Sequence, residues 1–350
     1  MDAFRDSRSL VVGGAGFVGS NLVRELLAQG SSQVLVVDNL LSSEAANLPG
    51  DPRVRLVEGS VTDDAVLASV EDAYDFIFHL ATYHGNQSSI ADPLADHANN
   101  TLTTLKLCEH IRNFRRVKRV VYSSAGCTVA EKTYEACSAT SEDAPVSLYL
   151  DSPYQISKVV GELYFNYYFM RYGMPVVKAR FQNVYGPGEV LGAGRWRGTP
   201  ATVWRNVIPT FIYRSLRGDA LPVQGGGVVT RDFIAVADIV RGLMLCADRG
   251  RPGENYNLAS GEETSILDLA GLINELTGNP TPPRVEPRRE WDRSGKRFGD
   301  TEKARRELGF TASVPLREGL DLTIQWTRAN LGRIEACMAR HAAQMAAAEG

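Results

Sequence analysis

A glycine-rich turn near the N-terminus limits the possible folds of this chain more than any other feature. A short apolar run at 10–12 leads into the sequence GGAGFVG at 13–19. An amphipathic segment follows over 17–29, and a second apolar run, QVLVVD, occupies 33–38. This order of strand, glycine turn, helix, strand and acid predicts the first unit of a dinucleotide-binding α/β fold.

The spacing of Gly13, Gly16 and Gly19 suits a pyrophosphate. The first glycines let the turn fold tightly against the phosphates, and the last lets the helix and strand pack closely. The N–H groups and dipole at the helix start favour an anion. Asp38 lies 19 residues after Gly19, the position of an acid that accepts from a ribose 2′-hydroxyl, which favours NAD over NADP. The alternative is a glycine-rich turn without a ligand, but the strand, helix and acid together favour the nucleotide site.

Predicted strands and helices continue to alternate through the first half of the chain. We expect further strands at 54–58, 75–80, 117–124 and 175–181, helices at 63–70, 93–112 and 153–172, and closing helices at 302–308 and 316–330. Such alternation predicts a parallel sheet with right-handed crossovers. The expected fold class is therefore α/β, with a doubly wound parallel sheet of the Rossmann type. Residues 1–182 would form the NAD-binding domain and 183–350 a smaller, mixed substrate-binding portion, some segments of which could return to the first domain.

The segment SPYQISK at 152–158 carries the residues that we expect to act on a substrate. Tyr154 and Lys158 are four residues apart, so on a helix they share one face. Lowering the pKa of a phenol from about 10 to about 7 requires roughly 4 kcal/mol, and a nearby ammonium and a nicotinamide cation both favour the phenolate. Alternatively, the pair stands on a surface helix by chance. The upstream nucleotide motif favours a general base and its partner.

Composition and charge argue against several other classes of protein. The 350-residue chain has 38 basic and 41 acidic residues and a net charge of −3, so no basic excess indicates nucleic-acid binding. No apolar stretch reaches the roughly 18 residues that indicate a membrane span, and the polar segment 1–9 does not resemble a signal peptide. Five scattered cysteines form no Cys-x-x-Cys, and the histidines show no metal-ligand spacing. We expect a cytoplasmic protein without a bound metal.

A series of ordered motifs runs over nearly the whole chain. They are GGAGFVGS at 13–20, VVDNL at 36–40, HLAT at 79–82, PLADHANN at 93–100, YSS at 122–124, SPYQISK at 152–158, RFQNVYGPGE at 180–189, VIP at 207–209, TRDFIAVADI at 230–239 and YNLASG at 256–261. In these the chain resembles the extended short-chain dehydrogenase/reductases, in the NAD-dependent nucleotide-sugar epimerase/dehydratase group, and is most similar to the UDP-sugar 4-epimerases.

The resemblance implies NAD as the cofactor. The residues expected to bind it are Gly13, Gly16, Phe17, Val18, Gly19, Asp38, Asn39, Ser60, Val61, Leu80, Ala81, Thr82, Asn100, Ser123, Tyr154 and Lys158. Asn100 is also expected to brace the active-site region. Ser60 stands where the family usually has an aspartate, but its hydroxyl can still form a hydrogen bond to the adenine.

The resemblance also implies a nucleotide-sugar substrate, with a UDP-sugar favoured. The residues expected to bind it are Tyr83, Ala125, Asn183, Val207, Arg231 and Arg289, with Asp292 close to the last. Arg231 would pair with the diphosphate, unless it forms a surface salt bridge. Arg195, Trp196 and Arg197 belong to a loop longer than the family minimum. They could reach the phosphates or a carboxylate on the sugar, or simply cover the surface.

In the family the shared first step is oxidation of the sugar at C4. Tyr154 would take the proton of the C4 hydroxyl, while Lys158 would hold the nicotinamide ribose and lower the pKa of Tyr154. A serine or threonine usually helps to bind the same hydroxyl, but this chain has Ala125 there. Ser124, Cys127 or Thr128 could supply the missing hydrogen bond, and we favour Ser124 or Thr128.

The residues that follow Ala125 in the same loop indicate which of the family's reactions this chain could catalyse. Its 4,6-dehydratases carry an Asp-Glu pair, and its decarboxylating members a glutamate, where this chain has Gly126 and Cys127. A glycine cannot transfer a proton, so C4 epimerisation through a 4-keto sugar is the favoured reaction. Alternatives are another nucleotide-sugar activity, such as 3,5-epimerisation with Cys127 as the acid/base, dehydration or reduction, or a non-catalytic NAD-binding regulator. Cys127 could instead be a core residue. A homodimer and a role in polysaccharide synthesis are likewise implied.

Overall fold

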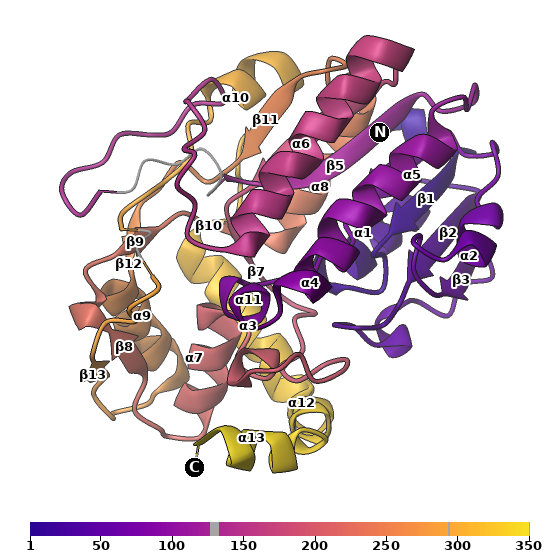
Figure 1. Cartoon of the computed structure of the whole chain (residues 1–350). Helices are drawn as coiled ribbons and strands as arrows, with labels where there is room; N and C mark the ends of the chain where they lie inside the picture. The colour runs from indigo at the N-terminus through magenta and orange to yellow at the C-terminus, as the bar shows by residue number, and fades with distance from the viewer. Residues whose placement is uncertain (127–132, 293–294, 350) are drawn as a thin grey trace.

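The computed structural model describes residues 1–126, 133–292 and 295–349, and its centre is a parallel sheet. Within these residues the sheet has seven strands in the order β11-β6-β5-β4-β1-β2-β3, and all neighbours are parallel (Figure 1). They are β1 (Arg8–Val12), β2 (Gln33–Asp38), β3 (Val54–Glu58), β4 (Phe76–His79), β5 (Arg119–Ala125), β6 (Val176–Phe181) and β11 (Asn255–Leu258). The predicted doubly wound sheet is confirmed, and β2 and β3 coincide with their predicted ranges.

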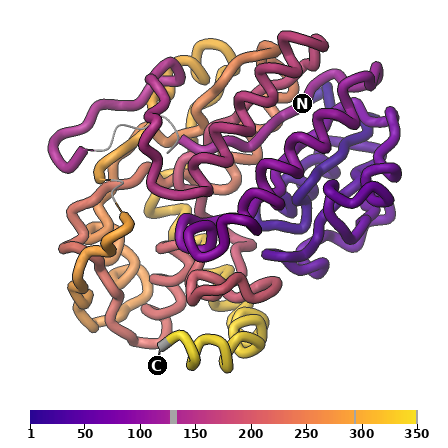
Figure 2. The backbone as a smooth tube through the Cα atoms, in the orientation of Figure 1, coloured from indigo at the N-terminus to yellow at the C-terminus, as the bar shows by residue number. Residues whose placement is uncertain are grey.

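Helices cover both faces of this sheet because its strands are apolar on both sides. Leu10 and Val12 of β1 belong to the core under α5 and α6, whereas Val11 belongs to the core under α1 and α8. Figures 1 and 2 show the two helical layers. The helices are α1 (Phe17–Ala28), α5 (Thr103–Ile111), α6 (Pro153–Tyr172) and α8 (Val236–Arg249), with the shorter α2 (Asp64–Ala68) and α3 (Asn86–Ala91). Among the described residues, no helix is both long and apolar enough to cross a membrane.

One helix predicted as continuous, 93–112, is interrupted. α4 (Pro93–Asp96) leads into a π-helical turn, His97–Leu102, before α5 begins. Asn100 lies in this wide turn, and its Nδ2 donates to Asp96 Oδ1 at 2.7 Å and to Ser157 Oγ of α6 at 3.1 Å. Single π turns are often found at functional sites. Here the turn brings Asn100 against the helix that carries Tyr154.

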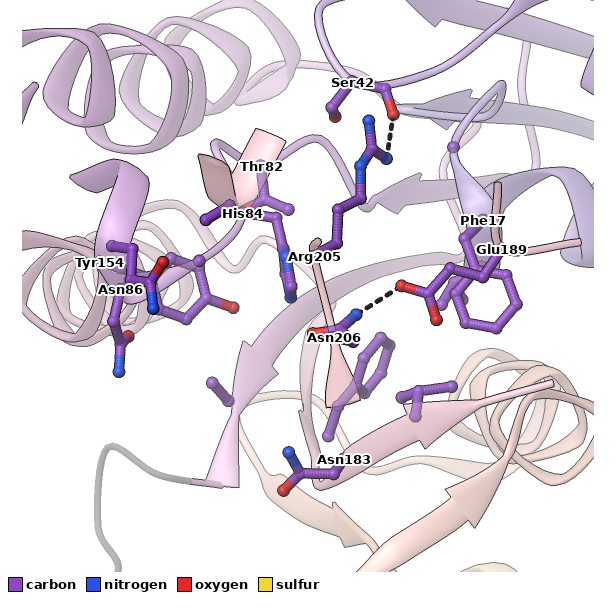
Figure 3. A pocket seen from close by; sticks show the side chains of 18 of the residues that line it. Phe17, Ser42, Thr82, His84, Asn86, Tyr154, Asn183, Glu189, Arg205 and Asn206 are labelled. Atoms are coloured by element: carbon purple, nitrogen blue, oxygen red, sulfur yellow. Dashed lines mark hydrogen bonds between the residues drawn. The ribbon is translucent and has the colours of Figure 1, made fainter. Parts of the chain in front are cut away.

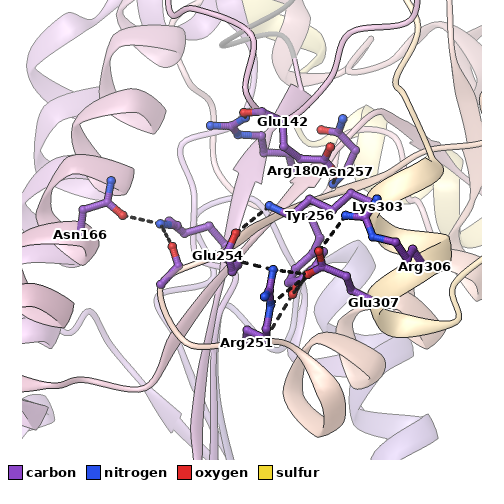
Figure 4. Close-up of polar contacts among 12 residues, drawn as sticks. Glu142, Asn166, Arg180, Arg251, Glu254, Tyr256, Asn257, Lys303, Arg306 and Glu307 are labelled. Carbon is purple, nitrogen blue, oxygen red and sulfur yellow. Dashed lines mark hydrogen bonds and ion pairs between the residues drawn. The ribbon is translucent and has the colours of Figure 1, made fainter.

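The second half forms a smaller mixed layer beside the sheet. Its apolar core joins α7, α9 and α11 through Phe211, Ile273 and Leu320. Its elements are β7 (Asn183–Tyr185), α7 (Val207–Leu216), β8 (Pro222–Gln224), β9 (Thr230–Arg231), β10 (Phe233–Ala235), β12 (Thr264–Ser265), α9 (Ile266–Thr277), β13 (Arg284–Glu286), α10 (Glu302–Leu308) and α11 (Leu316–Ala329), with 3₁₀ turns at Pro200–Thr202 and Gly225–Gly227. Two further 3₁₀ turns, Asp2–Phe4 and Ala45–Asn47, belong to the first half. β11 extends the main sheet and is held by α10 (Figure 4). Lys303 Nζ donates to Glu254 Oε2, just before β11, at 2.7 Å, and the hydroxyl of Tyr256 in β11 donates to Glu307 Oε2 at 2.9 Å.

The C-terminal helices α12 (Leu331–Ala339) and α13 (Ala342–Glu349) reach back to the first half. Ile334 packs against Val190 in the long loop after β7. Arg333 donates to the side chain of Asn47, and Asn47 donates to the carbonyl of Ala15 in the glycine turn at 2.7 Å. α12 therefore contacts both the loop after β7 and Asn47, whose side chain binds the turn that precedes α1.

Candidate active site

A cavity of ≈ 680 Å³ lies between the carboxyl ends of the sheet strands and the second half. This is where an open α/β sheet binds its ligands. The predicted residues that line it are Gly13, Gly16, Phe17, Val18, Gly19, Asp38, Asn39, Ser60, Val61, Leu80, Ala81, Thr82, Ser123, Ser124, Ala125, Tyr154, Lys158, Asn183, Val207, Arg231, Arg289 and Asp292. The structure thus brings together nearly all the described residues that the sequence suggested.

The glycine turn forms one end of the cavity and leaves no room for side chains. Gly13 has a φ of +84°, and a Cβ on it would lie 2.5 Å from the backbone nitrogen of Ala81. A Cβ on Gly19 would lie 2.3 Å from the carbonyl oxygen of Gly13. No described side chain caps the start of α1, so its dipole and N–H groups can face an anion. These features fit the pyrophosphate of NAD.

Asp38 ends β2 and is fixed beside the glycine turn. Its Oδ2 accepts from the backbone nitrogen of Ala15, and its Oδ1 accepts from Leu40 N and Ser43 Oγ, all at 2.9 Å. Burial raises the pKa of Asp38 and outweighs these hydrogen bonds, which lower it. The carboxyl group is therefore held at the cavity wall, where it can meet a ribose.

Tyr154 and Lys158 stand in the first turns of α6, at the middle of the cavity. Ser152 caps this helix by accepting from Gln155 N, and Pro153 fits its first position. Lys158 is buried, its Nζ donates to the carbonyl of Ser123 at 2.9 Å, and it lies 5.8 Å from the centre of the Tyr154 ring. A buried cation at this distance favours the phenolate form of Tyr154.

Ser124 is committed to a buried ion pair, which argues against it as the substitute for the missing serine. Its hydroxyl donates to Glu162, whose carboxylate also accepts from Arg180 Nε and Nη2 at 2.9 and 2.8 Å. Burial would raise the pKa of Glu162, but the hydrogen bonds and charge of Arg180 outweigh burial, so the pKa of Glu162 lies below its usual value. A hydroxyl has one proton to donate, so Ser124 cannot also donate it to a sugar. The other two candidates, Cys127 and Thr128, lie outside the described residues.

Among the residues expected to bind the cofactor or the substrate, Tyr83 and Asn100 are the exceptions, and of the loop residues Arg195, Trp196 and Arg197 only Arg197 lines the cavity. Neither Tyr83 nor Asn100 lines it. Instead, Asn100 Oδ1 accepts from the backbone nitrogen of Tyr83 at 2.6 Å, while its Nδ2 binds Asp96 and Ser157. The structure therefore places them behind the wall, where Asn100 braces the segment after β4 against α6. A direct contact of Asn100 with the cofactor, or of Tyr83 with the substrate, remains a prediction.

Arg231 forms part of the far wall, in the second half. It is 9% exposed, and its Nη1 donates to the carbonyls of Thr230 and Gly295 at 2.6 and 2.7 Å. Its Nη2 lies 3.9 Å from Asp292 Oδ2. Arg231 is thus a buried, oriented guanidinium rather than a surface salt bridge, which suits a diphosphate. Arg289 lines the same wall beside Trp291.

Several lining residues were not predicted from the sequence. Figure 3 shows His84, Arg205, Asn206 and Glu189 facing the cavity together with Tyr154. The rings of His84 and Tyr154 are 5.9 Å apart, edge to face. Desolvation, followed by the charges of Arg197, Arg205 and Lys158, lowers the pKa of His84 to about 3, so the imidazole is neutral. The position of His84 just after a sheet strand is the signal that could have identified it.

Comparison with known proteins places these features in a family. A sequence profile of the NAD dependent epimerase/dehydratase family matches residues 9–259. A UDP-glucose 4-epimerase of Mycolicibacterium smegmatis is 34% identical over 327 residues, which cover 92% of this chain and 98% of that protein. A dTDP-glucose 4,6-dehydratase of an Actinoplanes species is 32% identical over 335 residues, which cover 92% of this chain and 98% of that protein.

A solved structure is more similar still. The enzyme WbmF of Bordetella bronchiseptica, crystallised with NAD+ and UDP, is 59% identical with a TM-score of 0.90. The match covers 99% of this chain and 100% of that one. The likeness therefore includes both halves of the chain and the cavity between them.

Proposed function

Because the chain belongs to the NAD dependent epimerase/dehydratase family, we propose that it inverts C4 of a UDP-sugar through a 4-keto intermediate, with NAD as its resident cofactor. The observation that carries this proposal is the order of groups along one cavity. The glycine turn and Asp38 stand at one end, Tyr154 and Lys158 in the middle, and Arg231 in the far wall. The relatives that act on UDP-glucose or hold UDP support the choice of nucleotide.

Tyr154 acts on the C4 hydroxyl in this proposal. It removes the hydroxyl proton as the 4-keto sugar forms, and it returns a proton when the opposite C4 configuration is made. Lys158, fixed by the Ser123 carbonyl, keeps a positive charge beside the developing phenolate. The chemistry that NAD supplies when bound is reversible acceptance of a hydride from C4. The 4-keto sugar must turn in the cavity between the two transfers.

Elimination of water is not supported by the loop after β5. Gly126 occupies a position where the family's dehydratases are expected to carry an acid. A Cβ there would lie 2.2 Å from Nε2 of Gln182, at the end of a flexible side chain, so it is the missing acid and not the packing that disfavours elimination. Without a proton-transferring side chain at this position, a reaction that needs only Tyr154 and a hydride carrier is the better candidate.

A second candidate is epimerisation at C5 or C3, which removes a proton from carbon. The position of His84 supports it, because this imidazole lies 5.9 Å from the Tyr154 ring at the cavity wall, although its lowered pKa makes it a weaker base than a free histidine. Ala125 is compatible with it for a substrate that already carries a 4-keto group, because the ketone acidifies the protons at C3 and C5 and no C4 oxidation is needed. Cys127, the acid/base that the sequence suggested for this reaction, lies outside the described residues.

One experiment separates the two candidates. The purified protein is incubated with UDP-, dTDP- and GDP-sugars in deuterium oxide, and the ring protons are followed by NMR. C4 epimers without deuterium at C3 or C5 support the first candidate, whereas deuterium at C5 or C3 supports the second and contradicts the first. Bound NAD without any change in any sugar would overturn both and favour a non-catalytic protein.

We also propose that the chain forms a homodimer through α6. Ile156, Leu163, Tyr167 and Met170 recur at helical spacing and are 50%, 60%, 47% and 76% exposed. An exposed apolar stripe of this kind marks a protein contact. Sedimentation velocity of the NAD-loaded protein should give twice the monomer mass, and a monomer at micromolar concentration would contradict this proposal.

A further inference from the structure

Arg197 is a buried cation in the cavity wall with little to pair with. It is 4% exposed and lies on the loop between β7 and α7. Its Nη1 donates to the carbonyl of His84 at 2.8 Å, and its guanidinium lies 5.8 Å from the centre of the Tyr83 ring. Among the described residues, its Nε has no hydrogen-bond acceptor and no carboxylate forms an ion pair with it. A buried guanidinium in this condition is costly unless an anion reaches it.

Two nearby arginines show what a satisfied guanidinium looks like. Arg180 is also buried, but both of its forks meet acceptors, the Glu162 carboxylate and the Glu142 carbonyl. Arg205 donates to three carbonyls, those of Ser42, Ala193 and Thr202. These two cations are structural by their contacts. Arg197 differs because most of its donors remain unmatched in the described wall.

The charge around Arg197 also favours an anion. The charges of Arg205 and Lys158 act on the same small space, since both of them and Arg197 lower the pKa of His84. Two described acids act on Arg205, Glu189 and Glu44. Glu189 is buried and is hydrogen-bonded by Asn206, and Glu44 is already paired with Arg340. This part of the wall therefore has an excess of positive charge.

The position of Arg197 indicates which part of a substrate would supply the anion. If Tyr154 acts on C4, the sugar ring lies beside His84, whose carbonyl Arg197 holds. C5 is bonded to C4, so its substituent is the nearest group on the ring that could carry a charge. The diphosphate hangs from C1 and has its own guanidinium in Arg231. An arginine fork matches the geometry of a carboxylate.

We propose that Arg197 binds a carboxylate at C6 of the sugar, so that the substrate class is a nucleotide uronic acid. This inference rests on the proposed function for the orientation of the sugar. It makes Arg197 the residue that distinguishes an acidic sugar from a neutral one.

Calorimetry of the NAD-loaded protein tests the inference by binding alone. The ligands are UDP-glucuronate, UDP-glucose and UDP. The wild type should bind UDP-glucuronate roughly 10- to 100-fold more tightly than UDP-glucose, as expected for a charge-assisted pair. Arg197→Met should abolish this preference and leave the affinity for UDP-glucose and UDP unchanged. Arg197→Lys should restore part of it, and the exposed Arg195→Met on the same loop should leave it intact.

The outcomes separate this inference from the proposed reaction. No uronate preference in the wild type would overturn it without any variant. An equal loss of all three ligands in Arg197→Met, with normal thermal unfolding, would also overturn it and leave Arg197 as a positioning residue. If the preference is present and lost as expected, but no C4 epimer forms from either sugar, then the proposed reaction is wrong and the carboxylate site stands.

Discussion

The two walls of the cavity are built in different ways. The wall formed by the first half consists of strand ends and a glycine turn, so much of its contact surface is backbone from consecutive segments. The wall formed by the second half includes arginine side chains from segments far apart in the chain, among them Arg197, Arg231 and Arg289. A backbone wall recognises what all NAD-dependent relatives share. A side-chain wall can change with few substitutions, so it is where substrate choice should reside.

The largest effect should come from the residue that stands between the two walls. Tyr154→Phe removes the proposed general base and should lower turnover roughly 10²- to 10⁴-fold, measured as conversion of the nucleotide sugar by NMR. Bound NAD, followed by absorbance, should not change, because the backbone wall is intact. Tyr149→Phe, at a tyrosine that is 89% exposed, is the matched control. Near-normal turnover in Tyr154→Phe would remove Tyr154 from the mechanism.

A methyl group added to the glycine turn in the backbone wall should weaken binding of the cofactor more than binding of the substrate. In Gly19→Ala the new Cβ would meet the Gly13 carbonyl at 2.3 Å, so the turn must shift. We expect a loss of about 1–3 kcal/mol in the free energy of unfolding and weaker NAD retention, measured by denaturation and absorbance. Gly271→Ala in α9, where a Cβ meets nothing within 4 Å, should cause neither effect. If both variants kept NAD equally well, the close packing would not matter for the cofactor.

A smaller effect is expected from an acid in the side-chain wall. Burial raises the pKa of Glu189 to about 7, although the hydrogen bond from Asn206 and the charge of Arg205 lower it. A raised pKa means that the folded state binds more protons, so stability falls as the pH rises from about 4.3 toward 7. Glu189→Gln should lessen this fall by about 1–3 kcal/mol, measured by urea unfolding across that range. The control Glu290→Gln, on the exposed loop after β13, should leave the fall in stability unchanged. Identical curves of stability against pH for the wild type and Glu189→Gln would contradict the raised pKa of Glu189.

The difference between the walls also explains which cavity residues could be placed from the sequence alone. The glycine turn, Asp38 and the Tyr154–Lys158 pair could be located because each depends on residues close together in the sequence. Ser124 could not be judged in this way, because its partner Glu162 lies on another element and only folding shows that its proton is used. The π-helical turn that interrupts the predicted helix 93–112 at Asn100 could not be predicted either, because the partner of Asn100, Ser157, lies on another helix, α6. For the loop that carries Arg197 the sequence left three roles open: binding the phosphates, binding a carboxylate on the sugar, or covering the surface. The burial of Arg197 beside His84 depends on the tertiary structure, so the sequence could not show it.

The helices α12 and α13 give the cavity an order of assembly. The strands from β1 to β6 and their helices precede the second half in the chain, so the backbone wall can form during synthesis before the other wall exists. The loop that carries Arg197 packs against Ile334 and Cys337 of α12. The ribosome adds these two residues after all the elements that line the cavity. A nascent chain could thus hold its cofactor while its substrate wall is still incomplete. Until α12 is released, the chain should be a dinucleotide-binding protein without sugar selectivity.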